Sequence, residues 1–281
     1  MTAPTTIHQA APPHQPAAPD QPSGPAPGAA GSAAPCGPRP CWSADPYTDA
    51  LRSGHGPLFL RRTDGWLLPL DVERWCASAD AADLSVLRLC EGSVLDVGCG
   101  PGRLVAALAG LGSRALGIDV SQEAVTRTVG LGATALCRSV FEALPGEGRW
   151  GSVLLLDGNI GIGGRPGALL DRCGELLAPG GLLLAEAAPV DVDERVEVRI
   201  DDGRGAGEPV GQPFPWARVG ARALLRYAAH AGWSRAAQWE SGGRSFLALR
   251  RSRTAPPAVR TASHSAEAAK SPTVSHSQCS A

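Results

Sequence analysis

The sequence predicts an α/β fold with a mostly parallel, doubly wound sheet and helices on both of its faces. Five short apolar runs alternate with stretches whose apolar residues recur at helical spacing, which is the pattern of βα units. A glycine-rich loop follows the first apolar run directly. In parallel sheets, ligands gather at such loops, beyond the carboxyl ends of the strands. The sequence therefore predicts both a fold class and the place of a binding site.

The five apolar runs are the predicted strands. They are SVLDV (93–97), RALGID (114–119), ATALCRS (133–139), SVLLLD (152–157) and GLLLAEA (181–187). The predicted helices between them are RLVAALAGL (103–111), SQEAVTRTV (121–129) and GALLDRCGELL (167–177). Ser121 is a favourable N-cap for the second of these helices, and Pro166 is tolerated at the start of the third.

Further elements flank these units. DVERWCASADAADLSVLRLC (71–90) is predicted to form one or two helices that open at Asp71. After the fifth strand, ERVEVRI (194–200) is predicted to be extended and WARVGARALLRYAAHAG (216–232) to be a helix. SRAAQWESGGRSFLALRR (234–251) is predicted to be a hairpin that turns at residues 241–243.

Composition sets the limits of the domain. Residues 1–45 and 252–281 are rich in small residues and proline and poor in large apolar groups, so both are predicted to be disordered tails. One domain is predicted over residues 46–251, in which residues 46–90 form a helical segment on the substrate side. The 26 basic and 27 acidic residues leave a formal net charge of −1, which argues against nucleic acid as a partner.

The cysteines and the first residues bear on location. The eight cysteines form no CxxC pair and have no histidine at zinc-ligand spacing, which argues against a disulfide scaffold or a metal site. A reducing cytoplasm fits this pattern. The first residues have neither a basic nor an apolar signal region, and no apolar run is long enough to span a bilayer. We therefore expect a cytoplasmic protein without a membrane partner.

The stretch EGSVLDVGCGPGRL (91–104) carries the strongest functional signal. Its glycines permit a tight turn and remove Cβ atoms that would hold a ligand away, and the next helix offers unpaired N–H groups. Dinucleotide-binding loops have the spacing G-x-G-x-x-G, whereas this loop has G-x-G-x-G, and Asp96 lies where a phosphate would be repelled. A carboxylate there suits a ligand with an amino group and a sulfonium, such as S-adenosylmethionine, whose own carboxylate can use the loop N–H groups.

A second acid follows at the end of the second predicted strand. Asp119 lies 17 positions after Gly102 and is placed to hold two ribose hydroxyls. Enzymes that use NAD have the same device, so this residue alone does not distinguish the two cofactors.

On these residues the sequence resembles the class I S-adenosylmethionine-dependent methyltransferases. VLDVGCGPG matches their first motif, Asp119 their ribose-binding acid, and LLAPGGLLLAE the turn before their fifth strand. The resemblance spans about residues 90–250. It implies a Rossmann-like, seven-stranded sheet whose last strand is antiparallel, with S-adenosyl-L-methionine as cofactor. It also implies methyl transfer to a small-molecule acceptor by in-line displacement.

The resemblance also implies roles for individual residues. Asp96 and the loop at 98–102 would hold the methionine portion of the cofactor, Asp119 the ribose, and residues 139–141 would lie beside the adenine. Val140 stands where many family members have an Asp that bonds the adenine amino group, which leaves Phe141 and backbone groups to contact the ring. The predicted cofactor-binding residues are Asp96, Val97, Gly98, Cys99, Gly100, Pro101, Gly102, Asp119, Val120, Val140, Phe141 and Asp157.

No general base is identified from the sequence. In LLLDGNIGIGGRPG (154–167), Asp157, Gly158 and Asn159 are candidates for the wall that faces the acceptor, and the alternative is a flexible glycine turn. His55 and His230 are the only histidines of the predicted domain. Each is a candidate for the base, although a lone histidine is more often structural.

Two other groups of residues allow two interpretations each. Arg218, Arg222 and Arg226 are predicted to form a basic stripe on one helix, which either holds an acidic substrate or is a solvated face. The second group, Trp66, Trp75 and Trp216, either shapes an acceptor pocket or packs in the core.

Two further hypotheses stay open at this stage. One is a nicotinamide-dependent oxidoreductase on the same sheet, which the glycine spacing and Asp96 disfavour. The other is an S-adenosylmethionine-binding protein without catalysis. The methyl acceptor, the methylated atom and the oligomeric state are not predicted from the sequence.

Overall fold

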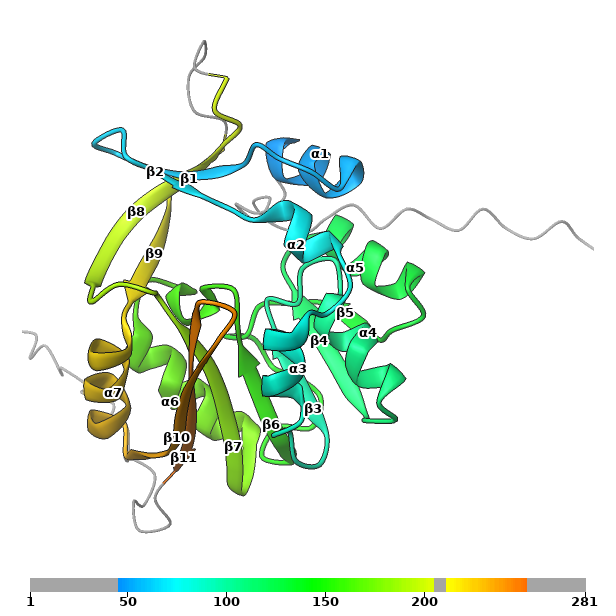
Figure 1. Cartoon of the computed structure of the whole chain (residues 1–281), viewed down its shortest axis with the longest axis vertical. Coiled ribbons are helices and arrows are strands. Elements are labelled where there is room, and N and C mark those ends of the chain that lie inside the picture. Colours follow the sequence, from blue (N-terminus) through cyan, green and yellow to red (C-terminus); the bar gives the residue numbers. More distant parts are fainter. Residues whose placement is uncertain (1–44, 205–210, 252–281) are drawn as a thin grey trace, which may run out of the picture. The chain divides into compact units, whose positions relative to one another are not determined.

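A seven-stranded sheet forms the centre of the computed structural model, which describes residues 45–204 and 211–251 (Figure 1). The chain divides into two units, residues 1–37 and 38–281, and all described residues belong to the second. The predicted tails lie outside the described residues, apart from Asp45, where helix α1 (Asp45–Ser53) begins.

The large sheet has the strand order β10-β11-β7-β6-β3-β4-β5. Its strands are β3 (Val94–Val97), β4 (Ala115–Asp119), β5 (Ala135–Cys137), β6 (Trp150–Leu155), β7 (Leu177–Ala187), β10 (Trp233–Ser241) and β11 (Arg244–Arg251). The strands from β3 to β7 pair in parallel, and β11 is antiparallel to both β7 and β10. This confirms the doubly wound sheet with an antiparallel last strand. The last strand lies inside the sheet, between β7 and β10 (Figure 1).

Helices cover both faces of this sheet because successive strand residues point to opposite sides. Leu95 and Val97 of β3 belong to a buried cluster with residues of α6 (Pro166–Leu176) and α7 (Ala221–His230). Val94 belongs to a second cluster with residues of α3 (Ala81–Leu87) and α4 (Arg103–Gly110). The same alternation in β6, β7 and β11 divides their apolar residues between the two clusters. The continuous apolar runs of the sequence therefore reflect strands buried on both faces.

The helix starts follow the predicted capping residues. Ser121 accepts a hydrogen bond from the Ala124 N–H at 3.3 Å and opens α5 (Gln122–Gly130), and Pro166 is the first residue of α6. The segment at 71–90 forms two helices, α2 (Val72–Cys76) with Asp71 as its N-cap, and α3. Local chemistry thus places these ends correctly.

A second, four-stranded sheet was not predicted. Its order is β2-β1-β8-β9, with all pairs antiparallel. The strands are β1 (Phe59–Arg62), β2 (Leu67–Pro69), β8 (Asp193–Asp201) and β9 (Phe214–Val219). Its apolar residues form their own buried cluster with residues of α1 and α2. Because β1 and β9 pair with β8, the sheet joins the start of the domain to the segment after β7 (Figure 1).

This sheet corrects two predictions. The segment at 46–90 is not only helical, because it contains the β1–β2 hairpin. The helix predicted over 216–232 begins only at Ala221, since the residues before it pair with β8, for example Trp216 with Val196. Local periodicity did not reveal these strands: β2 pairs with neighbouring β1, β1 also pairs with distant β8, and β9 pairs with β8.

The arginine stripe is also corrected. Arg218 lies on β9 and the other two arginines on α7, so the three do not share one helix. Each forms an ion pair with an acid at or near β8. The pairs are Arg218–Glu194 at 3.2 Å, Arg222–Asp191 at 3.3 Å and Arg226–Asp193 at 3.0 Å. These contacts tie β9 and α7 to β8 and leave no basic stripe for an acidic substrate. Along the two stretches that the structure describes, no helix is long and apolar enough to cross a membrane.

Candidate functional site

A cavity lies between the carboxyl ends of the parallel strands and a cover made by α1, α2 and β9. On the sheet side it is lined by residues 96–101, 103–104, 118–120, 138–141, 157, 159 and 162–163. On the cover side it is lined by Tyr47, Leu70, Trp75, Phe214, Pro215 and Trp216. All the predicted cofactor-binding residues line this cavity except Gly102.

The three glycines of the loop after β3 have different reasons to be glycine. All three have positive φ, at 73° for Gly98, 54° for Gly100 and 95° for Gly102. A Cβ on Gly98 would lie 2.7 Å from the Asn159 amide, and one on Gly102 would lie 2.6 Å from the Thr128 hydroxyl. Gly100 has no heavy atom within 4 Å of that position. The outer glycines thus allow close packing, and the middle one leaves open space at the cavity.

Asp96 is a buried carboxyl group that lines the cavity, and its Oδ2 has no hydrogen-bond partner. Burial raises its pKa to about 8, and the nearby negative charges of Asp157 and Asp119 act in the same direction. A buried polar atom without a partner is costly, so a positively charged ligand group at this oxygen would relieve the cost.

Asp119 ends β4 and is fixed by backbone donors. The Gly100 N–H donates to its Oδ2 at 2.9 Å, and the Ser121 N–H donates to its Oδ1 at 2.8 Å. Burial raises its pKa, while these hydrogen bonds act in the opposite direction. Each carboxylate oxygen keeps a second acceptor position, so the fixed group is able to accept two further hydrogen bonds.

The loop after β5 is held in place by α6. Arg172 donates from Nε to the Val140 carbonyl at 2.9 Å and from Nη2 to the Glu142 carbonyl at 2.8 Å. Val140 is buried, whereas the Phe141 side chain is exposed, and both line the cavity. A Cβ on Gly163 would lie 2.9 Å from the Phe141 ring, so this ring packs closely against the loop after β6.

Asp157 follows β6 and is held by three arginines. Arg103 Nη2 lies 2.6 Å from its Oδ2, while Arg74 Nη1 and Arg244 Nη2 lie 2.7 Å and 3.2 Å from its Oδ1. Its φ of 54° is the one positive value at a non-glycine residue among those described, and its N–H donates to Glu186 at 2.8 Å. The Asp157 carboxylate would have to give up ion pairs to act as a base. Its ion pairs instead fix the loop after β6.

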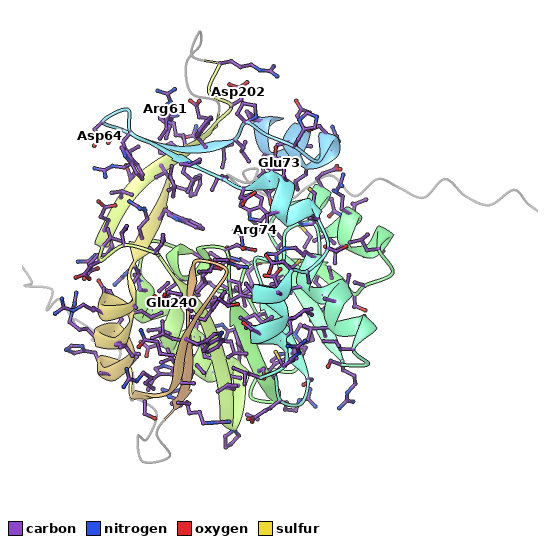
Figure 2. All side chains as sticks on the ribbon, in the orientation of Figure 1. Arg61, Asp64, Glu73, Arg74, Asp202 and Glu240 are labelled. Carbon is purple, nitrogen blue, oxygen red and sulfur yellow. The ribbon has the colours of Figure 1, made fainter. Side chains whose placement is uncertain are left out.

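These contacts belong to a larger buried ion network. Asp83, on α3, is fully buried and pairs with Arg103 and, at 2.7 Å, with Arg244. Arg244 also lies 2.7 Å from Glu186. Burial lowers the pKa of Arg103, and the negative charge of Asp157 counteracts it. Figure 2 labels Arg74 on α2, from where it reaches Asp157, so the network also joins the cover to the sheet.

Asn159 serves the glycine loop. Its side-chain amide donates to the carbonyls of Val97 and Gly98, both at 2.9 Å. The glycines that follow it are packed against β9, because a Cβ on Gly161 would lie 2.2 Å from the Ala217 carbonyl oxygen. A Cβ on Gly164 would lie 2.8 Å from Pro215. This loop is therefore held between the glycine loop and the cover.

Neither predicted histidine lines the cavity. His55 is exposed and its Nδ1 lies 3.2 Å from the Gly56 carbonyl. His230 is exposed at the end of α7, with its Nδ1 2.7 Å from the Arg226 carbonyl. The geometry gives no support to either residue as a general base.

The cover contributes residues that the sequence did not reveal. Tyr47 is buried, and its burial raises the pKa of the phenol well above the usual value, with the negative charge of Asp119 acting in the same direction. Trp75 and Trp216, which the sequence had singled out, line the cavity and also pack with the buried cluster of the small sheet. Trp66 lies outside the cavity lining, with Arg218 4.8 Å from its ring centroid.

One missed residue had a usable signal. Arg103 follows the glycine loop directly, and an arginine at the start of a helix is unfavourable for the helix dipole, which points to a specific partner. Tyr47, Phe214 and Pro215 had no comparable signal. Among the described residues, no group of three or more His, Cys, Asp or Glu side chains is arranged to hold a metal ion.

Comparison with known proteins agrees with this arrangement. Residues 94–181 match the family model of the methyltransferase domain. No curated protein matches the sequence significantly. A crystal structure of a SAM-dependent methyltransferase from Bacteroides fragilis, in complex with S-adenosyl-L-homocysteine, is 20% identical with a TM-score of 0.61. The match covers 75% of this chain and 95% of that one.

A second solved structure has the same fold. Its description reads "Conversion of a Disulfide Bond into a Thioacetal Group during Echinomycin Biosynthesis". It is 22% identical to this chain, with a TM-score of 0.50. The match covers 74% of this chain and 92% of that one. At these identities the two structures establish the fold alone, and the family model adds a match over residues 94–181. The chain therefore shares the fold of a solved SAM-dependent methyltransferase and, over residues 94–181, is similar to the methyltransferase domain.

Proposed function

We propose that this chain is an enzyme that transfers the methyl group of S-adenosylmethionine to a small-molecule acceptor by in-line displacement. The observation that carries the proposal is the buried, unpartnered Oδ2 of Asp96 at the cavity. A cationic ligand group satisfies that oxygen and stabilises the ionised carboxylate, whereas a phosphate would be repelled by the ionised form. The wider glycine spacing of dinucleotide loops is absent here, which argues in the same direction.

The residues present fit the cofactor. Asp96 would face its positively charged methionine end, and the N–H groups of the glycine loop would bind its carboxylate. Asp119 would accept hydrogen bonds from the two ribose hydroxyls, because the Gly100 and Ser121 N–H groups hold its carboxylate in place. Val120, Val140 and Phe141 would enclose the adenine. The bound cofactor supplies an activated methyl group, so the protein needs neither a nucleophile nor a metal of its own.

The protein's part in the reaction is then alignment and exclusion of water. Asn159 and Asp157 hold the loops after β3 and β6 in fixed positions. The cover closes the cavity with apolar side chains of α1, α2 and β9. A cavity covered in this way fits a small molecule better than a polymer. The net charge of −1 also argues against nucleic acid, and the cysteine pattern supports a cytoplasmic location.

Calorimetric titration of the full-length chain tests the cofactor. S-adenosylhomocysteine and NAD are titrated separately into the wild type, Asp119→Ala and Asp64→Ala. We expect saturable binding of S-adenosylhomocysteine alone, weakened at least about 30-fold by Asp119→Ala because two hydrogen bonds to a charged group are lost. Asp64, in the exposed β1–β2 turn, lies outside the cavity lining, and its variant should bind like the wild type (Figure 2).

Binding of NAD without S-adenosylhomocysteine would contradict the proposal and favour hydride chemistry. Binding of S-adenosylhomocysteine without methyl transfer to any acceptor in a broad screen would favour a cofactor-binding protein without catalysis.

A further inference from the structure

The cover side of the cavity differs in chemistry from the sheet side. We call Tyr47, Leu70, Trp75, Phe214, Pro215 and Trp216 the acceptor wall. None of these residues carries a formal charge, and four of them are aromatic. The rings of Phe214 and Trp216 meet edge to face, with centroids 6.3 Å apart and an interplanar angle of 89°. The wall therefore offers flat apolar surfaces to whatever lies opposite the cofactor.

The charged groups near this wall are already engaged. Asp157 is surrounded by three guanidinium groups, and Arg103 lies between Asp157 and Asp83. Arg138, the other cation of the lining, stands on the adenine side and donates to the Ala143 carbonyl at 3.1 Å. An anionic acceptor would thus find no uncommitted cation on the acceptor wall, and burying an unpaired anion is costly.

The wall also lacks a group that would remove a proton before transfer. The described lining contains no histidine, lysine or glutamate. Tyr47 keeps its proton because burial raises the pKa of its phenol well above the usual value. Asp119 accepts hydrogen bonds from the loop, and Asp96 is assigned to the cofactor. A neutral hydroxyl acceptor, which needs a base, is therefore disfavoured.

Resting on the proposed function, we infer that the acceptor is a flat, aromatic, uncharged molecule that is methylated on a nitrogen atom whose lone pair is available at neutral pH. The nitrogen lone pair forms the new bond to the methyl carbon. The sulfur–methyl bond breaks and its electron pair stays on sulfur, so the positive charge passes to nitrogen. A ring nitrogen has no proton to lose, and an amine releases one to water after the transfer.

The aromatic wall suits this transfer of charge. The positive charge moves from sulfur to nitrogen without leaving the cavity, and aromatic faces attract a cation at both stages. A flat ring also packs against the wall with little loss of conformational entropy. The same residues therefore bind the acceptor and stabilise the charge that forms on it.

The test uses the full-length chain saturated with S-adenosylhomocysteine, whose binding is measured first. Three bicyclic probes of similar size are then titrated at neutral pH: isoquinoline, decahydroisoquinoline and 2-naphthoate. They are a flat neutral nitrogen base, a saturated cationic amine and a flat anion. We expect isoquinoline to bind at least about tenfold more tightly than either of the others, because decahydroisoquinoline has no flat face and must lose the hydration of its ammonium group, and 2-naphthoate would be buried as an unpaired anion. With S-adenosylmethionine in place of its product, mass spectrometry should detect N-methylated isoquinoline.

Two tryptophan variants locate the binding. Trp75→Leu, on the acceptor wall, should weaken isoquinoline binding at least about fivefold through the loss of an aromatic face. Trp66→Leu, outside the cavity lining, should change it less than about twofold. Thermal unfolding checks that both variants are folded.

Several results would overturn the inference. They are equal or tighter binding of 2-naphthoate or decahydroisoquinoline, equal effects of the two tryptophan variants, or no binding of isoquinoline by a chain that binds S-adenosylhomocysteine. If S-adenosylhomocysteine itself does not bind, the proposed function fails, and the two failures are thus distinguished.

Discussion

The two sides of the cavity differ in how they are built. The sheet side consists of short stretches at the ends of consecutive strands, and it carries the acids and the glycine loop. The cover side is assembled from α1 and α2 together with β9, which begins more than 100 residues after α2 ends, and it is apolar. The proposed cofactor contacts thus come from local motifs, whereas the proposed acceptor contacts depend on tertiary packing. Functions can diverge on such a fold by changing one side alone.

The largest effect is expected from the ion network on the sheet side. Arg103→Met leaves fully buried Asp83 with Arg244 as its one ion-pair partner among the described residues and removes one of the three guanidinium groups from Asp157. Breaking a buried pair in this way should lower the free energy of unfolding by about 3 kcal/mol. Urea denaturation measures it, with Arg222→Met as the control.

Arg222 forms an exposed ion pair, so its variant should lose less than about 0.5 kcal/mol. Equal losses in the two variants would show that the buried network does not stabilise the sheet side more than a surface pair does.

Asp96 predicts a pH dependence of stability. Its pKa is about 8 in the folded chain and about 4 in the unfolded chain, so the folded state favours the protonated form. The unfolded state loses this proton first as pH rises, so the contribution of Asp96 to stability falls between about pH 4 and pH 8. Asp96→Asn removes this contribution.

The free energy of unfolding of Asp96→Asn should therefore increase relative to the wild type as pH rises through this range, measured by urea denaturation without ligand. Parallel pH profiles for the two proteins would mean that the carboxyl group is not buried and unpaired as described.

A smaller effect is expected where the cover meets the sheet side. Arg74→Met removes the ion pair between α2 and Asp157, but Asp157 keeps two arginine partners, so no buried charge is orphaned. The loss of unfolding free energy should be about 1 kcal/mol, well below that of Arg103→Met. Relative to the wild type, the variant should show a larger increase of amide hydrogen exchange in α2 than in α4. Equal exchange changes in both helices would contradict the separation of cover and sheet side.

The sequence predicted the sheet side well because its signals are local. The glycine loop, Asp119 and Ser121 each follow from a short pattern, and each lies where it was expected. The β1–β2 hairpin was missed because its strands have only four and three residues, and the further pairing of Phe59 with Asp201 lies far along the chain. Asp157 was predicted to bind the cofactor or to face the acceptor, but its arginine partners come from three other elements and have no common motif. Long-range strand pairing and buried ion pairs are thus the features that could not be predicted from a single sequence.

The position of β11 has a consequence for how the domain reaches its native state. β11 is the last strand in the chain, yet it lies between β7 and β10. Until residues 244–251 leave the ribosome, β7 keeps an unpaired edge and β10 has no place in the sheet. Synthesis therefore passes through a stage with an exposed, strongly apolar strand. Completion of the sheet depends on the end of the domain, so folding finishes only after translation of its last strand.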